Sequence, residues 1–170
     1  MAESASKPVF LVDAASDPVL VRIDGRACFQ NCAGLRDFIT TMAAEGRRRF
    51  VIDFRDCASM DSTFLGVLAG AAMALRRLGP EASLVAARPS PANLQLMRSL
   101  GLHRLLTLAP AVAPAAATGA TTGLESKSPN EIESARLVLA AHEQLVAADE
   151  SNRAKFEDVM AILRQRLGSP

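Results

Sequence analysis

The sequence contains neither tryptophan nor tyrosine among its 170 residues, so it lacks the rings on which proteins commonly stack bases or sugars. Its formal charge is balanced at +1, which removes the electrostatic argument for binding nucleic acid or an anionic membrane. The longest apolar run, residues 64–75, is too short to cross a bilayer and is typical of a buried helix. We therefore expect no nucleic-acid partner and no membrane insertion.

Cysteine is also scarce. Cys28 and Cys32 have the spacing of one helical turn, but no histidine or further cysteine lies beside them to complete a metal site. We interpret these two residues and Cys57 as small buried hydrophobes and expect no metal. The N-terminus has neither the basic segment nor the apolar core of an export signal, which predicts a cytoplasmic protein with reduced thiols.

Motifs for catalysis are missing as well. The two histidines, His103 and His142, lie in different segments, and no pattern places either beside a nucleophile and an orienting carboxylate. The chain has no phosphate loop and no dinucleotide fingerprint. We expect a protein that is not an enzyme and uses no cofactor.

The first part of the chain alternates between strand and helix signals. Strands are expected at 8–12, 18–23, 49–54 and 83–87, with a return to the sheet at 102–108. Helices are expected after Asn31, which is a good N-cap, and at 63–78 and 91–100. The order predicts an α/β domain over residues 1–109, with a mixed sheet of about four to five strands and three or more helices.

The second part of the chain has a different composition. Residues 110–127 are rich in Pro, Ala, Thr and Gly and are typical of a flexible linker. Ser128 to Glu131 reads as a capping box with Pro129 at the first helical position, and no Gly or Pro follows before Gly168. Residues 128–170 therefore predict a helical extension. It is either one long helix or a hairpin with a break near Asp149 to Asn152.

An apolar stripe runs along this extension. Its members are Val138, Ala141, Leu145, Ala148, Phe156, Val159, Met160, Leu163 and Leu167. A helix striped on one side cannot bury the stripe alone. We expect a homodimer through residues 128–167 as the simplest solution, with folding back over the first domain, or a foreign partner, as the alternatives.

The most informative segment is residues 51–70, which run from a buried strand through a polar turn into an apolar helix. Asp61, Ser62 and Thr63 stand where the helix begins, at the positive end of its dipole. From residue type alone, Asp61 or Ser62 simply caps the helix. The Asp-Ser pair and the Leu65-Gly66 that follows it resemble the signature of the STAS domain, the family of the bacterial anti-sigma factor antagonists.

The resemblance implies a STAS-like fold and a regulatory phosphoserine at Ser62, with Thr63 as the second choice. Two positions depart from the family's pattern. Phe64 stands where a small residue is common, and Cys28 stands where the family often carries an acidic residue near the serine. The expected partner-binding residues are Met60, Asp61, Ser62, Thr63, Phe64 and Asn31.

The resemblance also implies the partners. A serine kinase that doubles as an anti-sigma factor would phosphorylate Ser62, and a serine phosphatase would reverse the reaction. The added charge would weaken docking and so switch partners in transcription regulation. Two other roles stay open: a cytosolic STAS subunit of a lipid-transport complex, and a structural adaptor that assembles through its C-terminal helix.

Overall fold

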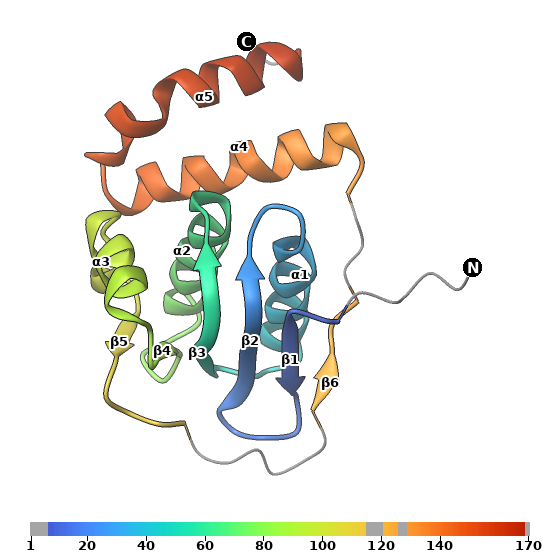
Figure 1. Ribbon diagram of the computed structural model, residues 1–170, viewed down its shortest axis with the longest axis vertical. Helices are drawn as coiled ribbons and strands as arrows, with labels where there is room; N and C mark the ends of the chain where they lie inside the picture. The colour runs from blue at the N-terminus through green and yellow to red at the C-terminus, as the bar shows by residue number, and fades with distance from the viewer. Residues whose placement is uncertain (1–6, 115–120, 126–128, 169–170) are drawn as a thin grey trace.

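The computed structural model describes residues 7–114, 121–125 and 129–168. A mixed β-sheet forms one layer of the molecule (Figure 1). The strand order across the sheet is β5-β4-β3-β2-β1-β6. Strands β2 to β5 run parallel, whereas β1 is antiparallel to β2, and β6 is antiparallel to β1. The strands are β1 (Phe10–Asp13), β2 (Val19–Ala27), β3 (Arg49–Met60), β4 (Ser83–Ala87), β5 (Thr107–Ala109) and β6 (Thr122–Gly123).

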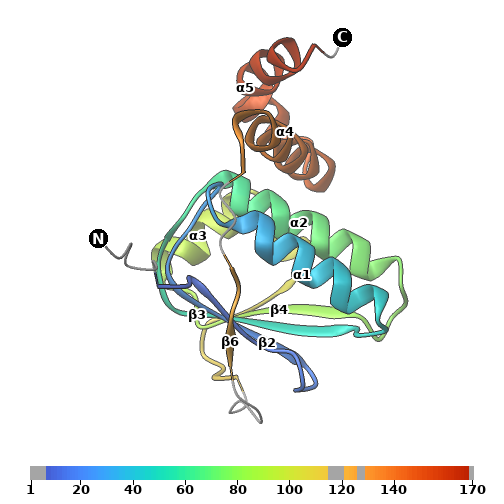
Figure 2. The ribbon, with the colours of Figure 1, turned by 90° about the vertical axis from the view of Figure 1, so that its right-hand side faces the viewer.

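Helices cover one face of this sheet, and the C-terminal helices lie beyond them, as the side view in Figure 2 shows. Alternate strand residues point toward the covering helices, so Val21, Ile23, Ile52 and Phe54 are almost fully buried. The helices are α1 (Cys32–Ala44), α2 (Ser62–Arg76), α3 (Pro91–Ser99), the short 3-10 helix η1 (Leu102–Arg104), α4 (Glu131–Ala148) and α5 (Asn152–Arg166). The STAS-like mixed α/β fold predicted from the sequence is confirmed.

One strand was not expected. Thr122 and Gly123 lie in the segment predicted as a linker, and they pair with Val12 and Leu11 at the edge of the sheet. The Leu124 amide continues the pairing by donating to the Phe10 carbonyl at 2.9 Å. Two residues are too few to show the alternation that marks a strand in a sequence. Residues 115–120 and 126–128 of the predicted linker lie outside the described residues.

The C-terminal extension is a hairpin of two helices, which we call the C-terminal hairpin (α4 and α5, Glu131–Arg166). The chain breaks at Asp149, whose backbone is extended and whose carboxylate accepts the Ser151 amide at 3.0 Å. This side-chain contact competes with continued helix, so the break needs neither Gly nor Pro. Of the two forms that the sequence left open, the hairpin is the one observed.

The predicted capping box is wrong by two residues. Asn130 is the N-cap of α4, with its Oδ1 accepting the Glu133 amide at 2.8 Å. Glu133 reciprocates by accepting the Asn130 amide at 3.0 Å. Pro129 therefore precedes the cap instead of following it, and Ser128 lies outside the described residues. The sequence holds two overlapping boxes, and an asparagine is as good an N-cap as a serine.

Candidate functional site

The first residue of the site is Asp61, which connects the start of α2 to the loop between β2 and α1. As N-cap, its Oδ1 accepts the Phe64 amide at 2.9 Å. Its Oδ2 accepts the Phe29 amide, also at 2.9 Å, from the loop between β2 and α1. The Asp61 amide in turn donates to the Ala27 carbonyl at 3.2 Å. Because Asp61 supplies the cap, the hydroxyl of Ser62 is left for other contacts.

Asn31 stabilises the loop between β2 and α1 through its side chain. It stands at the N-cap position of α1, as expected, but its side chain makes no capping hydrogen bond there. Its Oδ1 accepts the Cys28 amide at 3.0 Å, and its Nδ2 donates to the Arg26 carbonyl at 2.8 Å. Asn31 thus holds the loop that Asp61 ties to α2.

Ser62 is half-buried and its hydroxyl meets a histidine from α4. The distance from Ser62 Oγ to His142 Nε2 is 2.9 Å. His142 Nδ1 lies 2.6 Å from the Val138 carbonyl, which only accepts, so this nitrogen carries a proton. In the neutral ring, Nε2 is then the acceptor, and the Ser62 hydroxyl donates to it. No pattern in the sequence indicates this pair, because 80 residues separate its members.

His142 is almost entirely enclosed, with only 4% of the residue exposed. Phe156 of α5 packs edge-on against it, with the ring centroids 4.7 Å apart. The carbonyl that orients the ring is neutral, so the pair lacks the carboxylate of a Ser-His-Asp arrangement. The geometry therefore supports a structural contact across the α2–α4 interface.

Thr63 and Phe64, by contrast, point into the core. Thr63 is 4% exposed and Phe64 is fully buried. The Phe64 ring stacks on Phe10 at 6.1 Å and meets the edge of Phe54 at 6.2 Å. Met60 is half-buried at the end of β3 and pairs with Ala27 of β2. Of the six expected partner-binding residues, Phe64 and Thr63 thus lie beneath the surface at the start of α2.

The three thiols are free and buried. Burial, assisted by the nearby negative charge of Asp61, raises the pKa of Cys32 to about 12. Burial alone is the main reason why the pKa of Cys57 rises to about 11. Thiols that stay protonated at neutral pH are poor nucleophiles and poor metal ligands. Within the described part of the chain, no three side chains of His, Cys, Asp or Glu gather where they would hold a metal ion.

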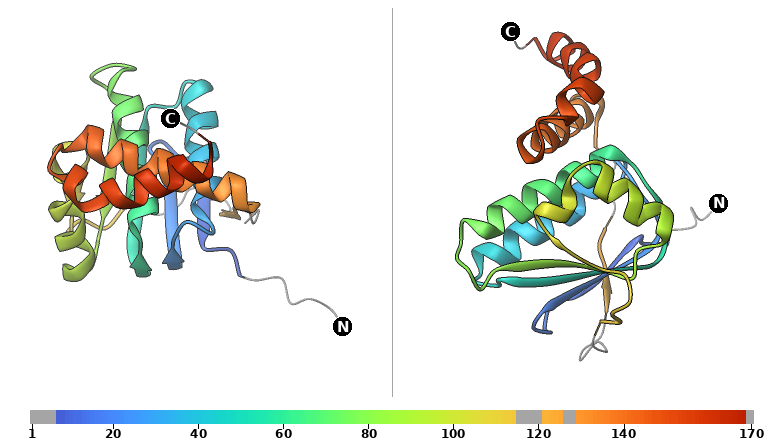
Figure 3. Two further views of the ribbon diagram at one scale, coloured as in Figure 1. Left: turned by 90° about the horizontal axis from the view of Figure 1, so that it is seen from above. Right: turned by 90° about the vertical axis from the view of Figure 1, so that its left-hand side faces the viewer.

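α4 lies across α2, as the view from above in Figure 3 shows. It covers the surface next to Ser62, whose hydroxyl meets His142 of α4. The two helices come close at Gly66, where an added Cβ would stand 2.2 Å from the Ala141 carbonyl oxygen. Only glycine fits there, and a small residue is needed opposite. Gly66 therefore faces α4 and not the sheet.

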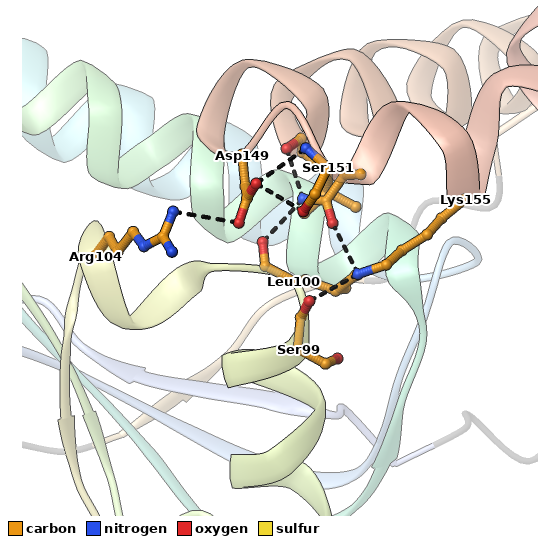
Figure 4. Close-up of polar contacts among 8 residues, drawn as sticks. Ser99, Leu100, Arg104, Asp149, Ser151 and Lys155 are labelled. Carbon is orange, nitrogen blue, oxygen red and sulfur yellow. Dashed lines mark hydrogen bonds and ion pairs between the residues drawn. The ribbon is translucent and has the colours of Figure 1, made fainter.

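A polar cluster fastens the corner of the C-terminal hairpin to the end of α3; we call it the corner latch (Asn152, Asp149 and Lys155 with Leu100, Ser99 and Arg104; Figure 4). Asn152 is fully buried, and its Nδ2 donates to the carbonyls of Leu100 at 2.9 Å and Leu145 at 2.8 Å.

Two charged side chains of the hairpin complete the corner latch. Lys155 donates to the Ser99 carbonyl at 2.8 Å, and Arg104 pairs with Asp149 at 3.4 Å. Hydrogen bonds from Ser151, aided by Arg104, lower the pKa of Asp149 and keep it charged.

Comparison with known proteins shows the family. The family model described as "Mlab, STAS domain" matches residues 10–108, more than half of the chain. This chain belongs to the STAS-domain family. The match ends at β5, so β6 and the C-terminal hairpin lie outside it. We call residues 10–108 the STAS domain from here on.

Two solved structures share the fold. SpoIIAA, an anti-sigma factor antagonist in its unphosphorylated form, is 19% identical with a TM-score of 0.51, and the match covers 61% of this chain and 89% of SpoIIAA. A protein of Thermotoga maritima (tm1081), provisionally assigned as an anti-sigma factor antagonist, is 16% identical with a TM-score of 0.51. That match covers 59% of this chain and 85% of the other.

At these identities the likeness is one of fold. No curated protein matches the sequence. Of the helices in the described ranges, none is both long and apolar enough to serve as a membrane span.

Proposed function

We propose that this chain is a regulatory binding module of the cytoplasm, with a docking surface centred on Ser62. The observation that carries the proposal is the hydroxyl of Ser62 at the first position of α2, in a STAS domain, with Asp61 already serving as the cap. A side chain that is not required for capping can be modified without loss of the helix. The partner is a serine kinase that acts as an anti-sigma factor, and a phosphatase restores the free serine.

Phosphorylation of Ser62 would change the charge of this surface. A phosphate adds about −1.5 to −2 charges at pH 7. The helix N-terminus favours that charge, but the Asp61 carboxylate beside it repels it. Since both oxygens of Asp61 accept backbone amides, the carboxylate cannot move away without breaking the helix cap or the hydrogen bond to the β2–α1 loop. The modified surface would therefore repel an acidic partner or recruit a basic one, which is the basis of the switch.

The test is mass spectrometry of the tagged chain isolated from the cells that produce it, together with the proteins that co-purify. We expect phosphate on Ser62, a soluble serine kinase among the partners, and loss of the phosphate in Ser62→Ala. Thr63→Val is the matched control and should retain it, because the Thr63 side chain is buried. Phosphate that persists in Ser62→Ala would refute the assignment of Ser62.

A STAS subunit of a lipid-transport complex is the second candidate, and the name of the matching family model, "Mlab, STAS domain", is the observation behind it. The proteins that co-purify with the chain distinguish the two candidate functions. An ATPase with membrane subunits in place of a soluble kinase would favour this candidate.

A further inference from the structure

A polar cavity lies at the far end of α2 from Ser62, beside the edge strand β5. Its volume is about 430 Å³, and it is lined by Arg76, Arg98 and His103 together with residues 105–108. Arg76 is the last residue of α2, so about 21 Å of helix separate it from Ser62. By contrast, the apolar groove of about 290 Å³ between α1, α2 and α4 is lined mainly by apolar residues.

Three elements each contribute one basic side chain to this cavity, which we call the basic cavity (Arg76, Arg98 and His103). Arg76 ends α2, Arg98 lies in the last turn of α3, and His103 lies in η1. The Arg76 guanidinium donates to the Arg104 carbonyl, which ties the end of α2 to η1. All three residues are exposed, so a dissolved ligand can reach them.

No carboxylate balances this charge within the described ranges. Neither the basic cavity nor the smaller cavity that adjoins it is lined by Asp or Glu, and none of the three basic side chains forms an ion pair there. Asp149 of the corner latch is engaged by Arg104. The last turn of a helix favours a basic side chain, which explains Arg76 and Arg98 singly but not their convergence with His103.

The donors of the basic cavity define the chemistry of a ligand. Guanidinium and imidazole N–H groups donate to phosphate oxygens, and an arginine can do so through two parallel hydrogen bonds. The exposed Thr107 hydroxyl adds a donor at the wall of the cavity. Two arginines and a histidine match the charge of a phosphate monoester, about −1.5 to −2 at pH 7, better than the single charge of a carboxylate.

The adjoining cavity leaves room for the rest of such a ligand. Its volume is about 160 Å³, and it shares Arg76 and residues 105–107 with the basic cavity. It extends between α2 and β4, where Ala72, Leu75 and Leu84 line it together with Ser83. A group esterified to the phosphate would therefore meet a mainly apolar wall with one hydroxyl.

We propose that the basic cavity binds the phosphate group of a small organic phosphate, and that the adjoining cavity receives the esterified group. Arg76 and Arg98 supply the charge, and His103 and Thr107 supply further donors. The site is independent of Ser62 and of the proposed function. A dissolved phosphate monoester and the headgroup of phosphatidic acid offer the same chemistry, so the experiment has one arm for each source.

Nuclear magnetic resonance of the isotope-labelled full chain tests the proposal, because the chain has no Trp or Tyr whose fluorescence would report binding. Glycerol phosphate is titrated at constant ionic strength in the first arm. In the second arm the chain is sedimented with vesicles of phosphatidylcholine, with and without phosphatidic acid. Arg98→Gln removes one charge from the cavity. Arg77→Gln is the matched control, since Arg77 is exposed and lines neither cavity.

We expect glycerol phosphate to cause saturable shifts of the amides of residues 98 and 103–108. Binding should be about ten-fold weaker in Arg98→Gln, which loses a charge-assisted hydrogen bond, and unchanged in Arg77→Gln. Binding to phosphatidic acid vesicles with the same dependence on Arg98 would support the cavity and identify a lipid as the source of the phosphate.

Three outcomes would overturn the proposal. The first is equal weakening in Arg98→Gln and Arg77→Gln, because the effect would then be one of general charge. The second is a set of shifts that spreads over all basic surfaces without saturation. The third is absence of binding in both arms while circular dichroism shows that the chain is folded.

Discussion

At the scale of single residues, Asp61 and Ser62 divide two tasks that the sequence alone could not assign. Asp61 is the cap and also binds the β2–α1 loop, whereas Ser62 contacts α4. Both are typical N-cap residue types, and their order along the chain does not say which one caps. The Asp-Ser pair therefore predicted where α2 begins but not which of the two residues caps it.

This division predicts unequal costs of substitution. Asp61→Ala loses the cap, worth about 0.5–2 kcal/mol, and also leaves the Phe29 amide without its acceptor. Ser62→Ala leaves the buried Nε2 of His142 without a donor, which costs about 1–3 kcal/mol. Asp61 accepts two backbone amides through a charged carboxylate, and each such bond is worth about 1.5–3 kcal/mol. Urea denaturation should therefore show Asp61→Ala to be the more destabilising of the two. If Ser62→Ala destabilised as much, Ser62 would be contributing to the cap.

The buried thiols predict how stability depends on alkaline pH. An unfolded cysteine has a pKa of about 8.5, whereas folding raises the pKa of Cys32 to about 12 and of Cys57 to about 11. Below about pH 8.5 both states keep the proton and the free energy of unfolding is unaffected. As the pH rises from there through the folded pKa values, only the unfolded thiols ionise, so stability falls.

The slope approaches about 1.4 kcal/mol per pH unit for each thiol between its two pKa values. Cys32→Ala should flatten the fall in stability measured by urea denaturation between pH 8 and pH 10, whatever its effect at pH 7. Ser59→Ala, at an exposed position, should keep the wild-type slope. An unchanged slope in Cys32→Ala would contradict the assignment.

At the scale of elements, the contact between α2 and α4 depends more on Gly66 than on Gly70. In Gly66→Ala the new Cβ would meet the Ala141 backbone at 2.2 Å, so a helix must shift. Such overpacking costs about 1–3 kcal/mol. In Gly70→Ala the nearest atom belongs to the flexible Gln144 side chain, and alanine favours the helix by up to about 1 kcal/mol.

We therefore expect Gly66→Ala to destabilise the chain and Gly70→Ala to be neutral or stabilising. Thermal unfolding of the two variants checks the expectation. Equal effects of the two substitutions would mean that α4 does not approach α2 at Gly66 as closely as the structure has it.

The elements that the sequence predicted are those with a periodic pattern or a strong stop signal. Gly46 and Gly79-Pro80 marked the ends of α1 and α2, and the alternation of Val19, Val21 and Ile23 marked β2. β6 escaped such patterns, since it depends on pairing with β1, far along the chain. The hairpin break was one of two forms that the sequence left open. Asn152 is the clearest case. It interrupted the apolar stripe in the sequence, and in the fold it is buried as the centre of the corner latch.

At the scale of the whole molecule, the apolar stripe of the C-terminal extension is largely satisfied within one chain. Leu145, Met160 and Leu163 are buried in the hairpin or against α2. Self-association through residues 128–167, expected as the simplest solution from sequence, is therefore not needed to cover these side chains. Folding back, the alternative, is the arrangement observed.

Light scattering should accordingly give the full chain the mass of a monomer, 18.0 kDa. Deleting residues 128–170 should raise the apparent mass, because the deletion uncovers Gly66, Val67 and the apolar groove beside them. A full-length dimer that dissociates when residues 128–170 are deleted would instead show that residues 128–167 mediate self-association.

The covalent connection between the STAS domain and α4 affects how tightly any other ligand can bind to α2. A tethered segment faces its own site at an effective concentration on the order of millimolar for short connections. A free helix of equal intrinsic affinity must reach a comparable concentration to displace half of α4. Any ligand for the surface that α4 covers would therefore bind a STAS domain without α4 more tightly than it binds the full chain.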